Sequence, residues 1–291
     1  MINISINSHS LGGRVILEDI SLTVPDGKVL GLVGTNGSGK STLLRLMSGV
    51  YVPDSGSVQY DGADVTIPSV RENIFFLPDD PYYAGQTTGV GIFDTYKTFY
   101  PNLDRELYRE LLTRFKLDEG AHQRNFSKGM RRQFYIALAL SARPKYLLLD
   151  EAFDGLDAFT KKTVIEEINR SVEENNSTVV ISSHALSELE TFCDLYALIE
   201  GQTIKSQGSL EEHAAKYSRY KLAFTEVPSR EIFSHLNVRD LEIRGKFVTI
   251  TLEGDEEKLY ESLLALNPAV IDREKLSFED IFITDVKGGR Q

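Results

Sequence analysis

The segment from residue 34 to residue 42 has the residue types and spacing of a phosphate-binding P-loop, a glycine and four residues followed by Gly-Lys-Ser. In such a loop the backbone N–H groups point inward, so that a phosphate rests on the N-terminus of the following helix. Lys40 is placed to reach the β- and γ-phosphates, and the Ser41 hydroxyl is placed to bind Mg2+. The predicted nucleotide-binding residues of the loop are Gly34, Thr35, Asn36, Gly37, Ser38, Gly39, Lys40, Ser41 and Thr42.

A P-loop requires a strand before it and a helix after it, and the sequence predicts both. Residues 29–33 are an apolar run typical of a buried strand, residues 43–47 read as the body of a helix, and Gly49 is placed to end that helix. The alternative is an ordinary glycine-rich turn. It is disfavoured because strand, loop and helix all stand in the required order. The segment therefore predicts a nucleoside triphosphate site.

Two further motifs identify a family. Residues 126–133, Phe-Ser-Lys-Gly-Met-Arg-Arg-Gln, lie shortly before the apolar run 146–149 and the pair Asp150-Glu151. With these motifs in this order, residues 1–210 resemble the nucleotide-binding subunits of ABC transporters. Ser127, Lys128, Gly129 and Met130 resemble the family signature, which usually reads Ser-Gly-Gly-Gln. The resemblance implies that this loop caps the γ-phosphate held by the opposite subunit. A serine N-cap before a helix is the ordinary interpretation, and both roles are compatible.

The resemblance also assigns roles around the second motif. The run 146–149 resembles a Walker B strand, so that Asp150 is implied to hold Mg2+ through water and Glu151 to act as general base. Asp157 follows in a segment that resembles the D-loop and would act across the dimer interface. His184 ends the apolar strand predicted at 178–182 and resembles the switch histidine, which contacts the γ-phosphate.

The sequence departs from the family pattern at two positions. Where the family stacks an aromatic ring on adenine, this chain has Leu11, which predicts weak recognition of the base or recognition by another residue. Where the family has a glutamine after the strand that ends at Pro78, this chain has Asp79. A carboxylate there is expected to bind Mg2+ directly, but it cannot donate a hydrogen bond. A turn residue after a proline is the ordinary alternative.

Alternating strands and helices predict an α/β fold, a P-loop NTPase core with a mostly parallel sheet, an antiparallel β edge and a helical subdomain at about 80–140. The pattern changes near residue 212. We therefore expect a nucleotide-binding domain at 1–211 and a small α+β accessory domain at 212–291, with a closing helix at 276–282. The accessory part contains no recognisable catalytic motif.

Composition limits the partners. The net charge of −11 disfavours a broad nucleic-acid surface, and Cys193 is the only cysteine, so no internal disulfide can form. No apolar run is long enough to span a membrane. The resemblance implies ATP and Mg2+ as cofactors and head-to-tail pairing with a second copy or a paralogous ATPase. It also implies a separate transmembrane permease, which this chain would bind at the cytoplasmic face of the membrane.

Several functions remain open at this stage. The segments 99–104 and 278–282 resemble an exporter-type bacterial branch, some members of which handle peptides or antimicrobials. The aromatic-rich region 82–100 is the candidate docking surface for the permease, although the same aromatic residues suit ordinary core packing. The alternatives are a soluble ABC ATPase acting on ribosomes or DNA, and a regulatory nucleotide binder without turnover. No tandem P-loop or basic arm supports the former, and Glu151 argues against the latter.

Overall fold

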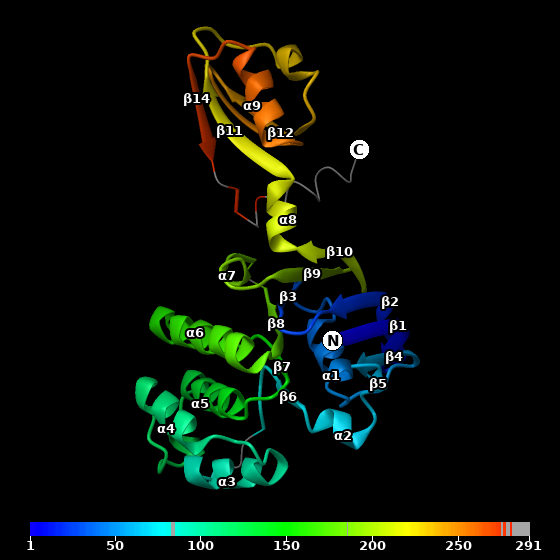
Figure 1. The fold of residues 1–291 in the computed structure, drawn as a ribbon, viewed down its shortest axis with the longest axis vertical. Helices are drawn as coiled ribbons and strands as arrows, with labels where there is room; N and C mark the ends of the chain where they lie inside the picture. Colours follow the sequence, from blue (N-terminus) through cyan, green and yellow to red (C-terminus); the bar gives the residue numbers. More distant parts are fainter. Residues whose placement is uncertain (83–84, 185, 275, 278–279, 281–291) are drawn as a thin grey trace. The chain divides into compact units, whose positions relative to one another are not determined.

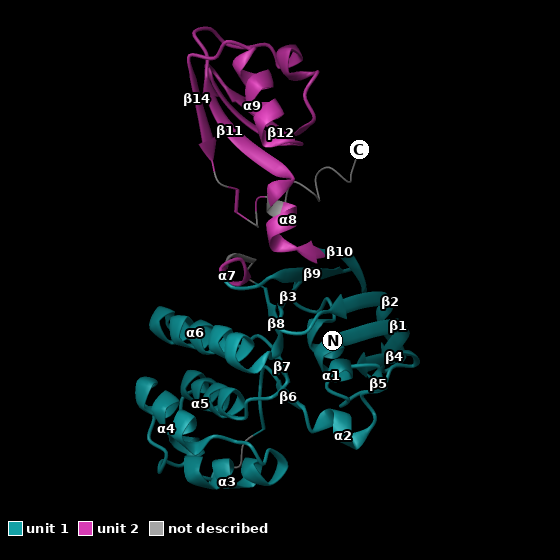
Figure 2. Ribbon diagram, viewed as in Figure 1, with its two compact units in different colours: residues 1–185, 192–207 teal, residues 186–191, 208–291 magenta. Residues whose placement is uncertain are grey.

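The computed structural model describes residues 1–82, 85–184, 186–274, 276–277 and 280. The chain divides into two compact units, shown in Figure 2, one comprising residues 1–185 and 192–207 and the other residues 186–191 and 208–291. The main part of the second unit thus begins at 208, whereas the change in sequence pattern suggested 212.

The first unit contains an antiparallel sheet with the strand order β2-β1-β4-β5. Ile2, Ile4 and Ile6 alternate with polar residues along β1 and are all buried, which gives this sheet one apolar face. The predicted antiparallel edge is confirmed, and β1 extends beyond the predicted residues 2–6. The strands are β1 (Ile2–Leu11), β2 (Arg14–Val24), β4 (Ser55–Tyr60) and β5 (Ala63–Asp64).

A six-stranded sheet with the order β10-β9-β3-β8-β7-β6 forms the centre of the fold. The neighbouring pairs from β9 through β3, β8 and β7 to β6 are all parallel, as predicted. Parallel strands end at a common edge, where α/β folds bind their ligands. The sequence analysis missed β9 and β10. The strands are β3 (Val29–Val33), β6 (Ile74–Leu77), β7 (Tyr146–Leu149), β8 (Thr178–Ser183), β9 (Leu195–Glu200) and β10 (Thr203–Ser209).

Helix α1 (Lys40–Met47) packs in the apolar core between these two sheets. Leu43, Leu44, Leu46 and Met47 are all fully buried, and their spacing places them on one face of the helix. The burial of each of these side chains contributes about 1.5–3 kcal/mol. This packing fixes the N-terminus of α1, and with it the P-loop.

The four longest described helices of the first unit begin at side-chain caps. Thr88, Asp104, Ser127 and Asp157 each accept a hydrogen bond from a backbone N–H of the first turn. Figure 1 shows α3, α4, α5 and α6 grouped together, apart from the antiparallel sheet. The helical region is less continuous than predicted, because α3 starts only at residue 89. The helices are α2 (Pro68–Arg71), α3 (Gly89–Phe99), α4 (Arg105–Arg114), the 3-10 helix η1 (Gln123–Asn125), α5 (Lys128–Ser141) and α6 (Ala158–Asn175).

The second unit contains an antiparallel sheet with the order β12-β13-β11-β14. With η2 and α9 in the connections, this is a split β-α-β arrangement and matches the predicted α+β class. The 3-10 helix η2 lies between β11 and β12, and the predicted helix at 276–282 lies mostly outside the described residues. The elements are α7 (Leu186–Leu189), α8 (Leu210–Ala215), β11 (Tyr217–Ala223), η2 (Arg230–Phe233), β12 (Val238–Arg244), β13 (Phe247–Glu253), α9 (Glu256–Leu264) and β14 (Val270–Glu274).

Candidate nucleotide-binding site

The P-loop connects β3 to α1 at the carboxyl edge of the central sheet. Gly37 and Gly39 have φ angles of 82° and 109°, which side chains other than glycine rarely adopt. Gly34 is required for a different reason, since a Cβ there would lie 2.5 Å from the carbonyl oxygen of Ile199. The loop therefore depends on its glycines for conformation and for space, and it leads into α1 at Lys40.

Lys40 lies inside the site rather than on the surface, with only 4% of its side chain exposed. Its ammonium group donates to the carbonyl oxygens of Gly34, at 2.7 Å, and Thr35, at 3.4 Å. It also pairs with the Glu151 carboxylate at 3.2 Å. Phosphate oxygens can replace the present oxygen partners of this buried cation.

Asp150 follows β7 and lies almost completely buried. Its Oδ1 accepts hydrogen bonds from the hydroxyls of Ser41, at 3.2 Å, and Ser182, at 2.7 Å. Its Oδ2 is buried and has no hydrogen-bond partner among the described residues. An orphaned carboxylate oxygen beside a serine hydroxyl suits Mg2+, which prefers oxygen ligands. The two residues named for the metal from the P-loop and the second motif thus fit the ion.

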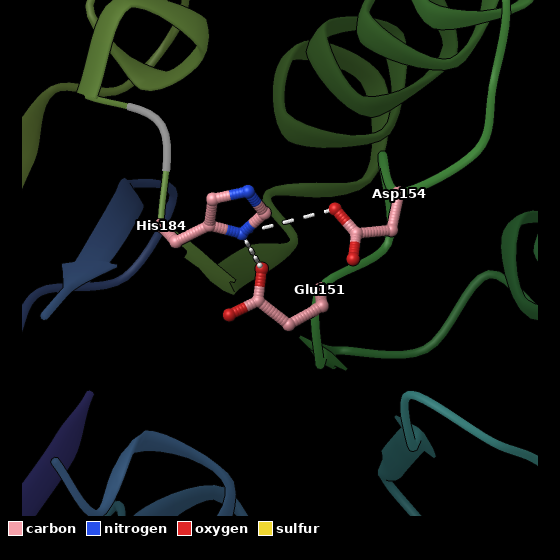
Figure 3. Close-up of side chains that lie close together, drawn as sticks. All are labelled: Glu151, Asp154 and His184. Atoms are coloured by element: carbon pink, nitrogen blue, oxygen red, sulfur yellow. Dashed lines mark hydrogen bonds and ion pairs between the residues drawn. The ribbon is translucent and has the colours of Figure 1, made fainter. Parts of the chain in front are cut away.

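Glu151, Asp154 and His184 form a cluster at the open side of the site, as shown in Figure 3. The Nδ1 atom of His184 lies 3.1 Å from Glu151 Oε2 and 3.8 Å from Asp154 Oδ1. Glu151 has a φ of 47°, which is uncommon for a residue with a side chain. The Glu151 carboxylate lies between the ammonium of Lys40 and the ring of His184, because one of its oxygens contacts each group.

These groups surround one cavity of about 470 Å3. The P-loop, the residues after β7 and the residue after β8 all contribute to it, as the sequence predicted. Leu11 is not among the described residues that line the cavity. The aliphatic side chain in the lining is that of Ile16 in β2. Sequence reasoning also missed Asp154. The lining residues are Ile16, Asn36, Gly37, Gly39, Lys40, Ser41, Thr42, Asp79, Glu151, Asp154 and His184.

Asp79 lies at the cavity wall but has a partner within the protein. Its carboxylate pairs with the guanidinium of Arg132, which also donates to the carbonyl oxygens of Asp79 and Glu151. Magnesium binding by Asp79 stays a prediction, and the interaction with Arg132 is one that the sequence analysis did not anticipate. Arg132 belongs to α5, which begins with the signature residues.

Among the described residues, neither the signature residues nor Asp157 of the D-loop line this cavity, whereas Asp154 at the start of the D-loop does. Ser127 caps α5 by accepting from the N–H of Met130 at 3.1 Å, and Lys128 is the first residue of that helix. Gly129 packs close to the D-loop, because a Cβ there would lie 3.1 Å from the carbonyl oxygen of Gly155. Asp157 caps α6, and its hydrogen bond from the backbone of Thr160 lowers the pKa of its carboxyl group.

A P-loop after one parallel strand, with an aspartate and a glutamate after a second strand of the same sheet, defines a P-loop nucleoside triphosphatase. Comparison with known proteins specifies the family. A profile described as ABC transporter matches residues 17–154. The chain is 31% identical to the ABC transporter ATP-binding protein YtrB of Bacillus subtilis, and the alignment covers 100% of both proteins. The chain therefore belongs to the family of ABC transporter ATP-binding subunits and is an ATPase of that family.

Other relatives match a large part of the chain rather than all of it. The lantibiotic transport ATP-binding protein SrtF of Streptococcus pyogenes is 32% identical over 70% of this chain and 89% of its own. The teichoic acids export ATP-binding protein TagH of Staphylococcus haemolyticus is 32% identical over 70% of this chain and 75% of its own. A solved ATP-binding subunit of an ABC transporter has the same fold, with a TM-score of 0.67 at 24% identity over 73% of this chain and 91% of its own.

Proposed function

We propose that the cavity binds ATP with Mg2+ and that Glu151 accepts the proton of the water that attacks the γ-phosphate. Lys40 and the P-loop N–H groups hold the phosphates, and His184 orients the Glu151 carboxylate. Ser41 and Asp150 hold Mg2+, which neutralises phosphate charge when bound. One observation carries this proposal: Lys40, Glu151 and His184 come from three strand ends and line one cavity, and Asp150 accepts a hydrogen bond from Ser41 in the cavity wall.

The active form is a head-to-tail dimer with a second copy or a paralogous ATPase. In it, Ser127, Lys128, Gly129, Met130 and Asp157 complete the site of the partner subunit. Their location outside the cavity of their own subunit supports this arrangement, and so does the exposure of Ser127 and Lys128 at the start of α5. A helix N-terminus carries partial positive charge, which suits a phosphate brought by the partner.

In this proposal the ATPase lies at the cytoplasmic face of the membrane, where it powers export by a separate membrane permease. Two observations support this proposal. No helix among the described residues is long and apolar enough to cross a membrane, and relatives of the chain are named for lantibiotic transport and teichoic acid export. Peptides or antimicrobials are the proposed substrates. The docking surface lies in the region 82–100, where Tyr82 is 90% exposed and Phe99 is 67% exposed.

The test is co-expression of the tagged chain with its candidate membrane subunit, followed by membrane fractionation and reconstitution into vesicles. We expect the chain to sediment with membranes only when that subunit is present, and its ATPase rate to change on assembly. The double variant Tyr82→Ser/Phe99→Ser should lose the membrane association but retain ATP hydrolysis. Sedimentation with ribosomes or DNA, independent of the membrane subunit, would instead support the soluble alternative.

A further inference from the structure

Arg132 is a buried cation that no nucleotide-binding motif explains. It is the fifth residue of α5, and only 4% of its side chain is exposed. Its guanidinium donates to three acceptors, the carbonyl oxygen of Glu151, the carbonyl oxygen of Asp79 and the Asp79 carboxylate. A buried guanidinium needs such partners, because an unpaired charge away from water is strongly unfavourable.

Two of these acceptors belong to the backbone at the ends of the neighbouring strands β6 and β7. The peptide segment at Glu151 has a left-handed conformation, with φ at 47°. It is held from both sides, since the N–H of Glu151 donates to Ser182 Oγ at 2.8 Å and its carbonyl accepts from Arg132. Strained backbone of this kind persists only where the surroundings fix it. Arg132 is therefore part of what directs the Glu151 side chain toward Lys40.

Helix α5 contacts the segment after β7 at two further points. Gly129 lies close to the Gly155 carbonyl, where a Cβ would come within 3.1 Å. Gln133 Nε2 donates to Thr160 Oγ1 at 3.1 Å, in the first turn of α6. The start of α5 thus contacts the segment that carries Glu151 at several points. Among these contacts, the hydrogen bond from Arg132 to the Glu151 carbonyl oxygen lies nearest to the Glu151 carboxylate.

We infer that Arg132 is a positioning residue for Glu151 and that Asp79 serves as the counter-ion of Arg132 rather than as a ligand of Mg2+. The inference rests on the proposed role of Glu151 as general base. Arg132 also links the helix that begins with the signature residues to the proposed base of the same subunit. When the partner's nucleotide contacts the start of α5, a shift of this helix would change the position of Glu151 through the Arg132 guanidinium.

The experiment measures kcat and KM for ATP in Arg132→Met, Arg132→Lys, Asp79→Asn and the double variant Arg132→Met/Asp79→Asn. We expect Arg132→Met to lower kcat about 10- to 100-fold, as a displaced catalytic group does, with KM changed less than about threefold. Arg132→Lys should recover little, because an ammonium cannot reach three acceptors in a plane. In the double variant the loss should equal that of Arg132→Met alone, since the two residues act as one unit.

Controls separate positioning from stability and from metal binding. Arg114 pairs with the buried Glu167 at 2.8 Å and joins α4 to α6, so Arg114→Met should lower thermal stability and leave kcat unchanged. The Mg2+ concentration for half-maximal activity should stay the same in Asp79→Asn. A higher Mg2+ requirement in Asp79→Asn alone, or losses that add in the double variant, would overturn the assignment.

A last variant distinguishes failure of this inference from failure of the proposed function. Arg132→Met should have little further effect in a Glu151→Gln background, because the base that it positions is already gone. A normal rate for Glu151→Gln would reject Glu151 as the base. A large loss for Glu151→Gln together with a normal rate for Arg132→Met would keep the base and reject Arg132 as its positioning residue.

Discussion

The Glu151 carboxylate contacts both the group that binds phosphate and the histidine at the mouth of the cavity. Lys40 lies 3.2 Å from one oxygen and His184 lies 3.1 Å from the other. Phosphates that bind the P-loop compete for Lys40, because the ammonium has a limited number of donors. We therefore expect nucleotide binding to weaken the Lys40–Glu151 pair and to free one carboxylate oxygen to accept a proton.

This competition gives Glu151→Gln two separate effects. The loss of the general base should lower kcat by at least about a hundredfold. ATP affinity should be unchanged or higher, since a neutral amide no longer competes with the phosphates for Lys40. Phosphate release and calorimetric ATP binding measure the two quantities. Near-normal turnover, or a large loss of ATP affinity, would contradict this account of Glu151.

The base of the nucleotide is the least specified part of the site. Ile16 lines the cavity in place of the predicted Leu11, and neither side chain can stack as an aromatic ring does. Stacking contributes about 1–3 kcal/mol per base by analogy with nucleic-acid binding. Without it, we expect GTP to compete with ATP within about tenfold, equivalent to about 1.4 kcal/mol.

A pair of tyrosine variants tests which position faces the base. Ile16→Tyr should raise the affinity for ATP and GTP, and Leu11→Tyr should change neither, as measured by competition with a fluorescent nucleotide. A gain only in Leu11→Tyr would favour the position that the family resemblance indicated. A preference for ATP of a hundredfold or more in the wild type would mean that another side chain recognises adenine.

The contacts of the site that the sequence predicted and those that it missed differ in how far apart along the chain the contacting residues lie. The P-loop residues are adjacent in sequence, so their pattern alone specifies both geometry and chemistry. The pairing of Arg132 with Asp79 joins residues 53 positions apart, and no local pattern predicts that the two residues pair. Ile16 replaces Leu11 in the cavity because the pairing of β1 with β2 decides which residues reach it.

At the scale of elements, a charged contact ties the β4–β5 turn to the start of β7. Asp61 Oδ2 accepts from Lys145 at 2.6 Å and from the hydroxyl of Tyr146 at 2.7 Å. The hydrogen bond from Lys145 is the main cause that lowers the pKa of Asp61 from its ordinary value of 3.8. This contact connects the antiparallel sheet to the central sheet at the end opposite to the P-loop.

The lowered pKa of Asp61 predicts how stability depends on pH. A carboxyl group with a lower pKa in the folded state stabilises the fold above its unfolded pKa of 3.8, and this contribution is lost as the pH falls toward the folded value. Because the group is largely exposed, we expect Asp61→Asn to cost only about 0–1 kcal/mol at pH 7.

The test is urea unfolding of wild type and Asp61→Asn at pH 7 and pH 3. Asparagine suits the comparison because Asp61 has a φ of 52°, a left-handed conformation that asparagine tolerates. The difference between the two proteins should shrink at pH 3, and Lys145→Gln should show the same trend. An equal difference at both pH values would mean that the contact acts by shape rather than by charge.

The elements that the sequence predicted best are those with a strong local pattern. β3 and β7 are apolar runs and β8 has an apolar centre, and both faces of each strand are buried. β10 is short of buried residues, so its place beside β9 comes from pairing and not from its own composition. The region 82–100 contains aromatic residues at helical spacing, but the helix begins only after the Thr88 cap.

At the scale of the whole molecule, the head-to-tail dimer predicts complementation between two inactive variants. Lys40→Ala removes the cation that meets the phosphates in its own site, and Gly129→Asp places a negative side chain where the partner's nucleotide would lie. In a dimer of one variant with the other, both changes fall in the same site. The second site then has an intact P-loop from one copy and an intact signature from the other.

Each variant alone should therefore have almost no ATPase activity, and an equimolar mixture should recover about a quarter of the wild-type rate if subunits exchange freely and sites act independently. The measurement is phosphate release after mixing, with the double variant Lys40→Ala/Gly129→Asp mixed with Lys40→Ala as the control that cannot recover. If the signature instead acted on the nucleotide of its own subunit, every mixed dimer would contain two defective sites. The mixture would then stay inactive, and the head-to-tail arrangement would be rejected.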